Sequence, residues 1–249
     1  MSDPVTRYVP ALEGSAYDDV SIRDVLTMSS GVRWDETYTD PRSDRRRLLE
    51  AQIAQRPGGV LAVLASLERA APPGTVNNYN TGETQVIAEV LRRAIGRPLA
   101  DYLHDRIWAK AGMEADAYWW LDAPGGVEIG GSGIAATLRD YGRFGLFVLN
   151  EGIVGGDTVL PAGWVRDATT PRTLRDGAPL DYGYLWWLGS YGTGGERAWY
   201  MTGNGGNRVV VFPDLEIVVV ITTTNYGRRD AHPLSDRILS EHVLESVVR

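Results

Sequence analysis

Four segments near the end of the chain place the strongest constraint on its fold. They are rich in aromatic and β-branched residues and read YGYLWWLGS, ERAWYMTG, NRVVVFP and EIVVVITTT, between residues 182 and 224. This composition, interrupted by turn residues, predicts four strands. Pro213 and Asp214 supply a tight turn between the last two, so these should pair antiparallel. Each of those two carries three successive valines, which means that both faces of the sheet need a cover.

Helical patterns surround this predicted sheet. Apolar residues recur at helical spacing in 40–55, 83–95, 99–111 and 137–150, and in a terminal helix over 235–248. In the first helix, Leu48, Leu49 and Ile53 should face inward, and Tyr118, Trp119 and Trp120 should belong to the core. We therefore expect an α+β fold in which helices cover an antiparallel sheet. A single domain over 1–249 would comprise a mainly helical subdomain at 15–175 and the sheet with its terminal helix at 181–249.

Composition excludes several classes of function. A net charge of −7 and a pI near 5.1 argue against a nucleic-acid partner. The chain has no cysteine, which excludes disulfides and thiolate nucleophiles. Its three histidines do not stand at metal-ligand spacing, so we expect no metal and no cofactor. No apolar run reaches the roughly 20 residues that a membrane span requires. The compartment and the oligomeric state stay open.

The stretch PPGTVNNYNTGETQVIAEVL, residues 72–91, presents Tyr79 on an irregular loop just before a helix. Pro72, Pro73 and Gly74 predict a turn, and Thr81 stands where a helix N-cap is expected. Taken alone, these residues favour a structural tyrosine with a buried ring and a solvated hydroxyl. The alternative is a hydroxyl held in place over a cleft.

A resemblance changes that balance. PGT-x-x-x-Tyr followed by Asn80 resembles the second motif of the serine β-lactamase-like hydrolases, which include class C β-lactamases, DD-peptidases, esterases and nylon-oligomer hydrolases. Further segments resemble this superfamily in the expected order: SIRDVLTMSSG at 21–31, GGSGIAATLRDYGRF at 130–144, the stretch from Val159 to Trp164, and Gly203–Asn207 at the third motif. Two positions depart from the pattern, since Thr81 replaces an asparagine and Asn204 replaces a lysine or histidine.

The resemblance implies an acyl-transfer mechanism on a small ester or amide, including β-lactam or aminohexanoate-type bonds. A serine in Ser-x-x-Lys attacks the carbonyl, and the motif-two tyrosine, here Tyr79, acts as general base or proton relay. By the same resemblance the substrate-binding residues would be Asn80, Thr81, Asn204, Gly205, Gly206 and Asn207. The backbone N–H of Asn207 would be one oxyanion donor. Trp119, Trp120, Trp186 and Trp187 are candidates for an apolar cleft wall.

The nucleophile itself is missing from the sequence. Lys110 is the only lysine, and the residue three positions before it is Ile107, so no Ser-x-x-Lys exists in the chain. The opening DPVTRYVP resembles the superfamily's linker after the nucleophile helix, which favours an N-terminally truncated hydrolase that is inactive as this fragment. Any signal peptide would then lie in the missing part. The alternative hypothesis is a non-catalytic binding or scaffold protein that keeps the fold.

Overall fold

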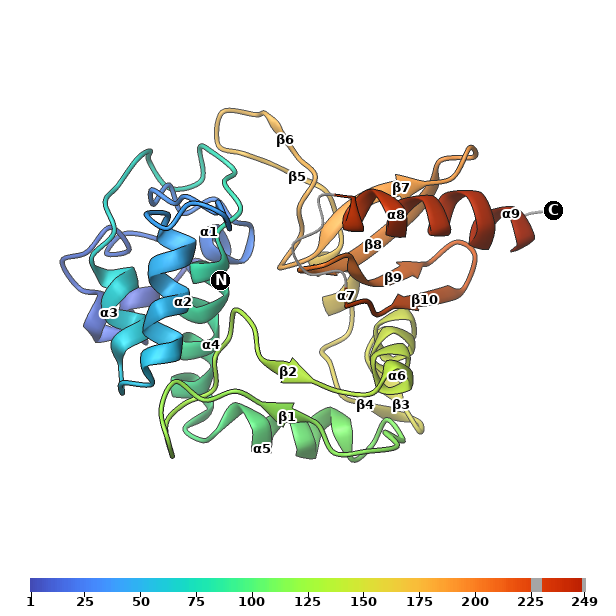
Figure 1. Ribbon diagram of the computed structural model, residues 1–249, viewed down its shortest axis with the longest axis horizontal. Coiled ribbons are helices and arrows are strands. Elements are labelled where there is room, and N and C mark those ends of the chain that lie inside the picture. The colour runs from blue at the N-terminus through green and yellow to red at the C-terminus, as the bar shows by residue number, and fades with distance from the viewer. Residues whose placement is uncertain (225–229, 248–249) are drawn as a thin grey trace. The chain divides into compact units, whose positions relative to one another are not determined.

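The computed structural model describes residues 1–224 and 230–247, and the chain divides into two units (Figure 1). Unit 1 comprises Met1–Asp105, Ala117–Ala135 and Arg172–Leu180. Unit 2 comprises Arg106–Asp116, Ala136–Pro171 and Asp181–Arg249. Helices and antiparallel strands together make this an α+β fold, which confirms the expected fold class.

Unit 1 is mainly helical. Its elements are η1 (Val5–Arg7), η2 (Pro10–Leu12), α1 (Ile22–Leu26), α2 (Asp44–Ala54), α3 (Gly59–Ala65), α4 (Thr81–Ile95) and α5 (Leu99–Leu103), with two short strand pairs, β1 (Tyr118–Trp119) with β2 (Ile134–Ala135) and β5 (Arg172–Thr173) with β6 (Pro179–Leu180). A capping box starts α1, because Ser21 and Asp24 each accept a hydrogen bond from the other's backbone N–H. Gly96 ends α4 with φ 69°, in the left-handed conformation typical of a helix C-cap.

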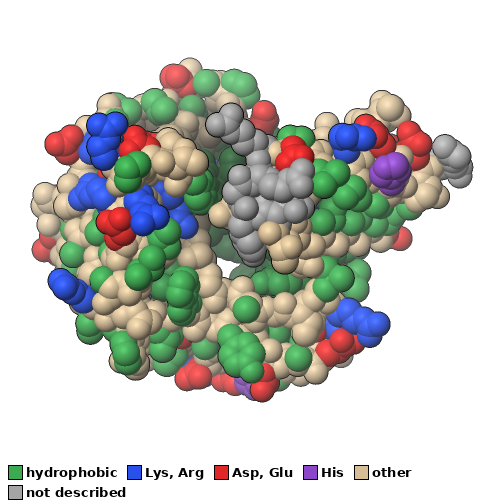
Figure 2. Space-filling model, viewed as in Figure 1, with side chains coloured by type: hydrophobic (Ala, Val, Ile, Leu, Met, Phe, Trp, Pro, Cys, Tyr) green, Lys and Arg blue, Asp and Glu red, His purple; other side chains and the backbone are tan. Residues whose placement is uncertain are grey.

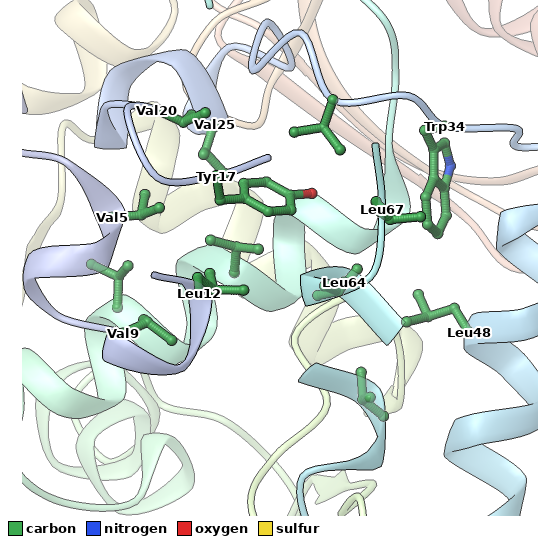
Figure 3. Packing of buried hydrophobic residues seen from close by; sticks show 14 residues of the cluster. Val5, Val9, Leu12, Tyr17, Val20, Val25, Trp34, Leu48, Leu64 and Leu67 are labelled. Atoms are coloured by element: carbon green, nitrogen blue, oxygen red, sulfur yellow. The ribbon is translucent and has the colours of Figure 1, made fainter. Parts of the chain in front are cut away.

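The core of unit 1 forms around the fully buried ring of Tyr17 (Figure 3). Valines and leucines from η1, η2, α2 and α3 surround it, and α4 adds Val86 and Val90. Burial of each such aliphatic side chain contributes about 1.5–3 kcal/mol relative to exposure. This core holds α4, and therefore the loop that precedes it, in one place.

Unit 2 contains a four-stranded antiparallel sheet in the order β10-β9-β8-β7. Its strands are β7 (Trp187–Tyr191), β8 (Glu196–Gly203), β9 (Asn207–Phe212) and β10 (Ile217–Ile221). The hairpin of β9 and β10 pairs Phe212 with Ile217, so the predicted turn at Pro213-Asp214 is confirmed. The first strand begins later than predicted, because Gly183 donates its N–H to Trp186 O and Leu185 takes a φ of 60°, which closes a turn there.

Helices cover both faces of this sheet, as the successive valines require. On one face α6 (Leu138–Leu149) packs Phe147 and Val148 against β7, β8 and β9. On the other face lie α8 (Ala231–Arg237), η4 (Ile238–Val243) and α9 (Leu244–Val247), whose Leu239 and Leu244 contact Val210 and Phe212 (Figure 1). Thr137 caps α6 as predicted. The remaining elements of unit 2 are β3 (Ile153–Val154), β4 (Asp157–Thr158) and α7 (Trp164–Ala168).

Several local expectations were wrong. Helix α2 begins at Asp44 rather than at residue 40, and Ile53 is 60% exposed. The helix expected over 99–111 is the short α5 followed by a π-helical segment, η3 (His104–Trp108). Tyr118 and Trp120 are 76% and 49% exposed, so they do not belong to the core. Tyr118 begins the two-residue strand β1 and Trp120 follows it, and in the described residues β1 pairs with β2 alone.

The surface carries both signs of charge. On the face drawn in Figure 2, arginine side chains stand among aspartates and glutamates rather than in a continuous basic field. Within residues 1–224 and 230–247, no helix has the length and apolarity needed to cross a bilayer.

Candidate active site

Two groups of predicted site residues lie in different units: Tyr79, Asn80 and Thr81 in unit 1, and Asn204–Asn207 in unit 2. Backbone hydrogen bonds within unit 1 fix the loop that presents Tyr79. Gly74 N donates to Ser29 O at 2.7 Å, and Asn78 N donates to Met28 O at 2.9 Å. The side chain of Asn77 donates to Thr27 O at 3.1 Å. The loop is therefore attached to the residues that follow α1, and Tyr79 is presented from a fixed base.

Asn80 and Thr81 form the start of α4. The N-cap is Asn80, one residue before the predicted Thr81, and its Oδ1 accepts from Gly82 N at 2.7 Å. Asn80 is fully buried and Thr81 is 4% exposed. In this structure both side chains serve the helix and the loop, and their part in substrate binding stays a prediction.

Glu36 is a site residue that the sequence analysis missed. Its Oε1 accepts the Thr81 hydroxyl at 2.5 Å, and its Oε2 accepts Thr81 N at 3.1 Å and the indole N–H of Trp34. Arg45 Nε lies 3.8 Å from Oε1, and the Arg45 guanidinium lies 5.2 Å from the centre of the Tyr38 ring. A carboxylate, an arginine and a second tyrosine thus accompany Tyr79, although 34–45 matches no motif that would have indicated them.

The surroundings of Tyr79 hold its hydroxyl in the neutral form. Burial, and then the charge of Glu36, raise the pKa of Tyr79 to about 12, while a hydrogen bond with Thr81 and the charge of Arg45 act in the opposite direction. At neutral pH the Tyr79 hydroxyl therefore donates a hydrogen bond or a proton. It could act as a base only if a further positive charge approached it.

The third-motif residues of unit 2 form the turn between β8 and β9. Gly203 pairs with Asn207, and Gly205 and Gly206 have φ of 83° and 89°. Asn207 bridges the turn, because its Nδ2 donates to Asn204 O at 2.7 Å and its Oδ1 accepts Thr223 N at 2.9 Å. Asn204 is exposed. The arrangement is a glycine turn at the strand end that the Asn207 side chain links to both Asn204 and Thr223.

Helix α8 supports this turn from behind. The Ser235 hydroxyl donates to Gly206 O at 2.6 Å, and a Cβ on Gly206 would meet Ala231 O at 2.5 Å. Arg208, buried at the start of β9, lies 2.6 Å from His232 Nδ1 through its Nη1 and donates to Asp236 Oδ1 at 3.1 Å through its Nη2. Burial and the charge of Arg208 lower the pKa of His232. His232 is thus a neutral partner of Arg208.

Of the other aromatic candidates, Trp187 stacks on Tyr200 within the sheet, with 6.4 Å between ring centres. The Trp119 indole N–H donates to Ile129 O at 2.9 Å in unit 1. In the described residues no group of three or more His, Asp or Glu side chains is arranged to hold a metal ion.

Comparison with known proteins places the chain in a family. The family model described as Beta-lactamase matches residues 1–242, and the chain belongs to that family. The 6-aminohexanoate-dimer hydrolase of Paenarthrobacter ureafaciens is 30% identical over 210 residues, which cover 79% of this chain and 52% of that protein. The D-aminopeptidase of Brucella ovis is 30% identical over 154 residues, covering 54% of this chain and 28% of that protein. The chain thus spans about half, or less, of these relatives' lengths.

Solved structures confirm the fold. A Bacillus anthracis protein assigned as a 6-aminohexanoate-dimer hydrolase superposes with a TM-score of 0.83 at 24% identity, covering 100% of this chain and 67% of that one. A penicillin-binding protein homologue from Caulobacter crescentus gives a TM-score of 0.68 at 18% identity, covering 97% of this chain and 75% of that one. The suspected superfamily is therefore confirmed, and the named relatives are hydrolases.

Proposed function

We propose that these residues are part of a serine hydrolase that cleaves an amide or ester bond of a small molecule through an acyl-enzyme. The observation that carries the proposal is the neutral Tyr79 hydroxyl, presented by a hydrogen-bonded loop and bordered by Glu36 and Arg45. The names of the relatives, a 6-aminohexanoate-dimer hydrolase and a D-aminopeptidase, favour an amide over an ester.

In this mechanism Tyr79 transfers a proton and does not remain as a phenolate. Its hydroxyl carries a proton at neutral pH and can donate it to the leaving group when the scissile bond breaks. Earlier, when the nucleophilic hydroxyl must lose its proton, a nearby cation would lower the pKa of Tyr79 and let it accept. Lys110 is not the lysine of a Ser-x-x-Lys motif, because Ile107 stands three positions before it, and its Nζ pairs with Asp157 Oδ2 at 2.9 Å. In this proposal the nucleophile and its lysine therefore come from a part of the protein outside these 249 residues.

The turn at Asn204–Asn207 would bind the carbonyl oxygen. Gly205 and Gly206 form the turn with positive φ, and the N–H of Asn207 would be one of the oxyanion donors. The exposed Asn204 offers a neutral amide where a lysine would offer a charge. It therefore suits a hydrogen bond to an uncharged amide better than attraction of a substrate carboxylate.

The test compares this chain with a longer protein that includes an upstream Ser-x-x-Lys segment. The chain alone should show no burst of acylation with p-nitrophenyl esters or nitrocefin, while the longer protein should hydrolyse a small amide. In the longer protein Tyr79→Phe should lower kcat by roughly 10²–10⁴, as expected for a lost acid/base group. Tyr118→Phe is the matched control, because Tyr118 is 76% exposed.

Two results would contradict the proposal. A burst from the 249-residue chain would show that an unrecognised nucleophile is present. An unchanged kcat in Tyr79→Phe would show that Tyr79 has a structural role. A longer protein that binds amides without ever being acylated would instead favour the non-catalytic alternative.

A further inference from the structure

A cavity of about 360 Å³ lies wholly within unit 1, behind the loop that carries Tyr79. Three segments enclose it: α1 with the residues that follow it, the turn at Gly74, and the hairpin of β5 and β6. Tyr79 is not among the lining residues, so the cavity is a separate feature from the candidate active site.

The residues that line the cavity carry more positive than negative charge, although the whole chain is acidic. Arg23, Arg172 and Arg175 line it, and Asp24 is its only acidic residue, although the whole chain has a net charge of −7. Asp24 is largely committed already, because its Oδ2 accepts Ser21 N at 3.1 Å, the Ser21 hydroxyl at 2.6 Å and Arg175 Nη2 at 3.3 Å. Among the lining residues Asp24 pairs with Arg175, so the charge of Arg23 is left for a ligand to neutralise.

Among the arginines that line the cavity, Arg23 is the one best able to bind a ligand. It is exposed, and within the described part of the chain its guanidinium forms neither an ion pair nor a hydrogen bond. The planar guanidinium fork matches two oxygens of a carboxylate or phosphate. On the inner wall the hydroxyls of Thr27 and Ser29 lie 2.9 Å apart, and both side chains are buried. The buried Leu180 adds an apolar side to the same cavity.

We propose that this cavity binds a small oxyanion, a carboxylate or phosphate group on a short body, between Arg23 and Arg175. The two arginines bind the anion, a hydroxyl of Thr27 or Ser29 donates a hydrogen bond to it, and Leu180 packs against the body. The volume of about 360 Å³ is at the lower end of the range for small-molecule pockets, which suits a small ligand.

Binding of an anion in this cavity should also affect the loop that carries Tyr79. Arg175 N donates to Gly74 O at 2.8 Å, and Gly74 N donates to Ser29 O at 2.7 Å, so one turn joins two walls of the cavity. The Arg175 side chain lies so close over Gly74 that a Cβ there would meet its Nε at 2.5 Å. An anion that holds Arg175 therefore also holds the turn that begins the loop at 72–80.

The experiment titrates the 249-residue chain with inorganic phosphate and, separately, with succinate, at constant ionic strength set by sodium chloride. Calorimetry should show saturable binding of at least one of the two, and which binds more tightly separates the phosphate source from the carboxylate source. Arg23→Gln should weaken binding about tenfold, the effect of losing one charge-assisted hydrogen bond. Arg56→Gln, at an exposed position away from the cavity, should leave it unchanged.

A second measurement guards against misfolding of a variant. Hydrogen exchange of the amides in 72–80 should slow when the anion saturates the wild-type chain and should not slow in Arg23→Gln, whose unliganded exchange should match wild type. No saturable binding of either anion would overturn the proposal. So would binding that Arg23→Gln and Arg175→Gln both leave unchanged, because the anion would then bind elsewhere.

Discussion

Glu36 accepts both the backbone N–H and the hydroxyl of Thr81, at 3.1 and 2.5 Å, and so holds a carboxylate at the first turn of the helix that follows Tyr79. This pair explains two features together. The carboxylate stabilises the positive N-terminal end of α4. Its charge also opposes ionisation of Tyr79, so one residue both supports the helix and keeps the tyrosine neutral.

The first prediction tests this dual role with Glu36→Gln. Without the carboxylate, the pKa of Tyr79 should fall below its value of about 12, because only burial and the charge of Tyr38 then oppose ionisation. The measurement is an alkaline titration of the chain with ¹³C-labelled tyrosine, in which the Tyr79 signal is assigned by its loss in Tyr79→Phe.

Glu13→Gln, an exposed carboxylate in unit 1, is the control and should leave the Tyr79 titration where it is. The pKa of Tyr38 should also fall in Glu36→Gln, because Glu36 is the second cause, after burial, that raises it. A Tyr79 pKa that does not move would show that Glu36 does not contribute to raising it.

The second prediction concerns Glu83, which is buried in the first turn of α4 and accepts the hydroxyl of Ser30. Its Oε2 lies among buried atoms without a hydrogen bond, as do Asn80 Nδ2 and the Tyr17 hydroxyl. Burial, followed by the charge of Asp24, raises the pKa of Glu83 well above its usual value, so folding must bind a proton there.

Glu83→Gln should therefore stabilise the chain at neutral pH and bring no gain below about pH 4.5, where Glu83 is protonated in the unfolded chain as well. The contribution of Glu83 to wild-type stability should be greatest below about pH 4.5 and fall as pH rises toward its folded pKa. Urea unfolding across this pH range measures the unfolding free energy. Glu13→Gln is the control, because it removes an exposed carboxylate. If Glu83→Gln leaves the unfolding free energy at pH 7 unchanged or lowers it, Glu83 is charged in the folded protein.

The sequence predicted those elements that local chemistry determines. Successive valines at 209–211 and 218–220 required cover on both faces, and Ser21 and Thr137 were recognised as caps because a hydroxyl three residues before an acid is a local signal. The N-cap of α4 was misplaced by one residue because Asn80 and Thr81 are both good caps, and tertiary contact with Glu36 decided between them.

The surroundings of Tyr79 could not be predicted in the same way. Glu36 and Arg45 reach the loop through tertiary packing, more than 30 residues away in sequence, and neither belongs to a spaced motif. The same holds for the cluster of Tyr17, Ser30 and Glu83, which comes from three separate segments. The sequence motif predicts Tyr79 as a site residue. Its pKa depends on neighbours brought close by tertiary packing, which no local pattern in the sequence indicates.

The third prediction is that Gly206→Ala destabilises unit 2 through two additive causes. The φ of 89° is unfavourable for alanine, and the new Cβ would meet Ala231 O at 2.5 Å, which forces α8 away from the turn. Gly195→Ala separates these causes, because Gly195 has a φ of 72° but nothing within 4 Å of an added Cβ. Chemical denaturation should show Gly206→Ala less stable than Gly195→Ala by about 1–3 kcal/mol, the usual cost of overpacking. Equal losses would mean that α8 can move freely.

The last prediction is a loss of stability in mild acid that depends on His232. The Arg208 guanidinium donates to His232 Nδ1, which requires a neutral imidazole, and Asp236 is the acid that faces the same guanidinium. Tyr191 reaches Asp236 from β7, with its hydroxyl 3.5 Å from Oδ1. Because the folded pKa of His232 is lowered, the unfolded chain binds the proton more readily. Its contribution is present above the usual histidine pKa of about 6.5 and is lost as pH falls through the folded value.

His232→Gln keeps an acceptor for Arg208 but cannot take up a proton, so its unfolding free energy should vary less between about pH 7 and pH 5 than that of the wild type. His242→Gln is the control, because His242 is exposed on η4 in the same unit. Thermal unfolding at several pH values, followed by tryptophan fluorescence, gives the comparison. If His232→Gln keeps the full wild-type slope, the acid sensitivity belongs to other groups, and the Arg208–His232 hydrogen bond does not control how firmly α8 supports the turn at Gly206.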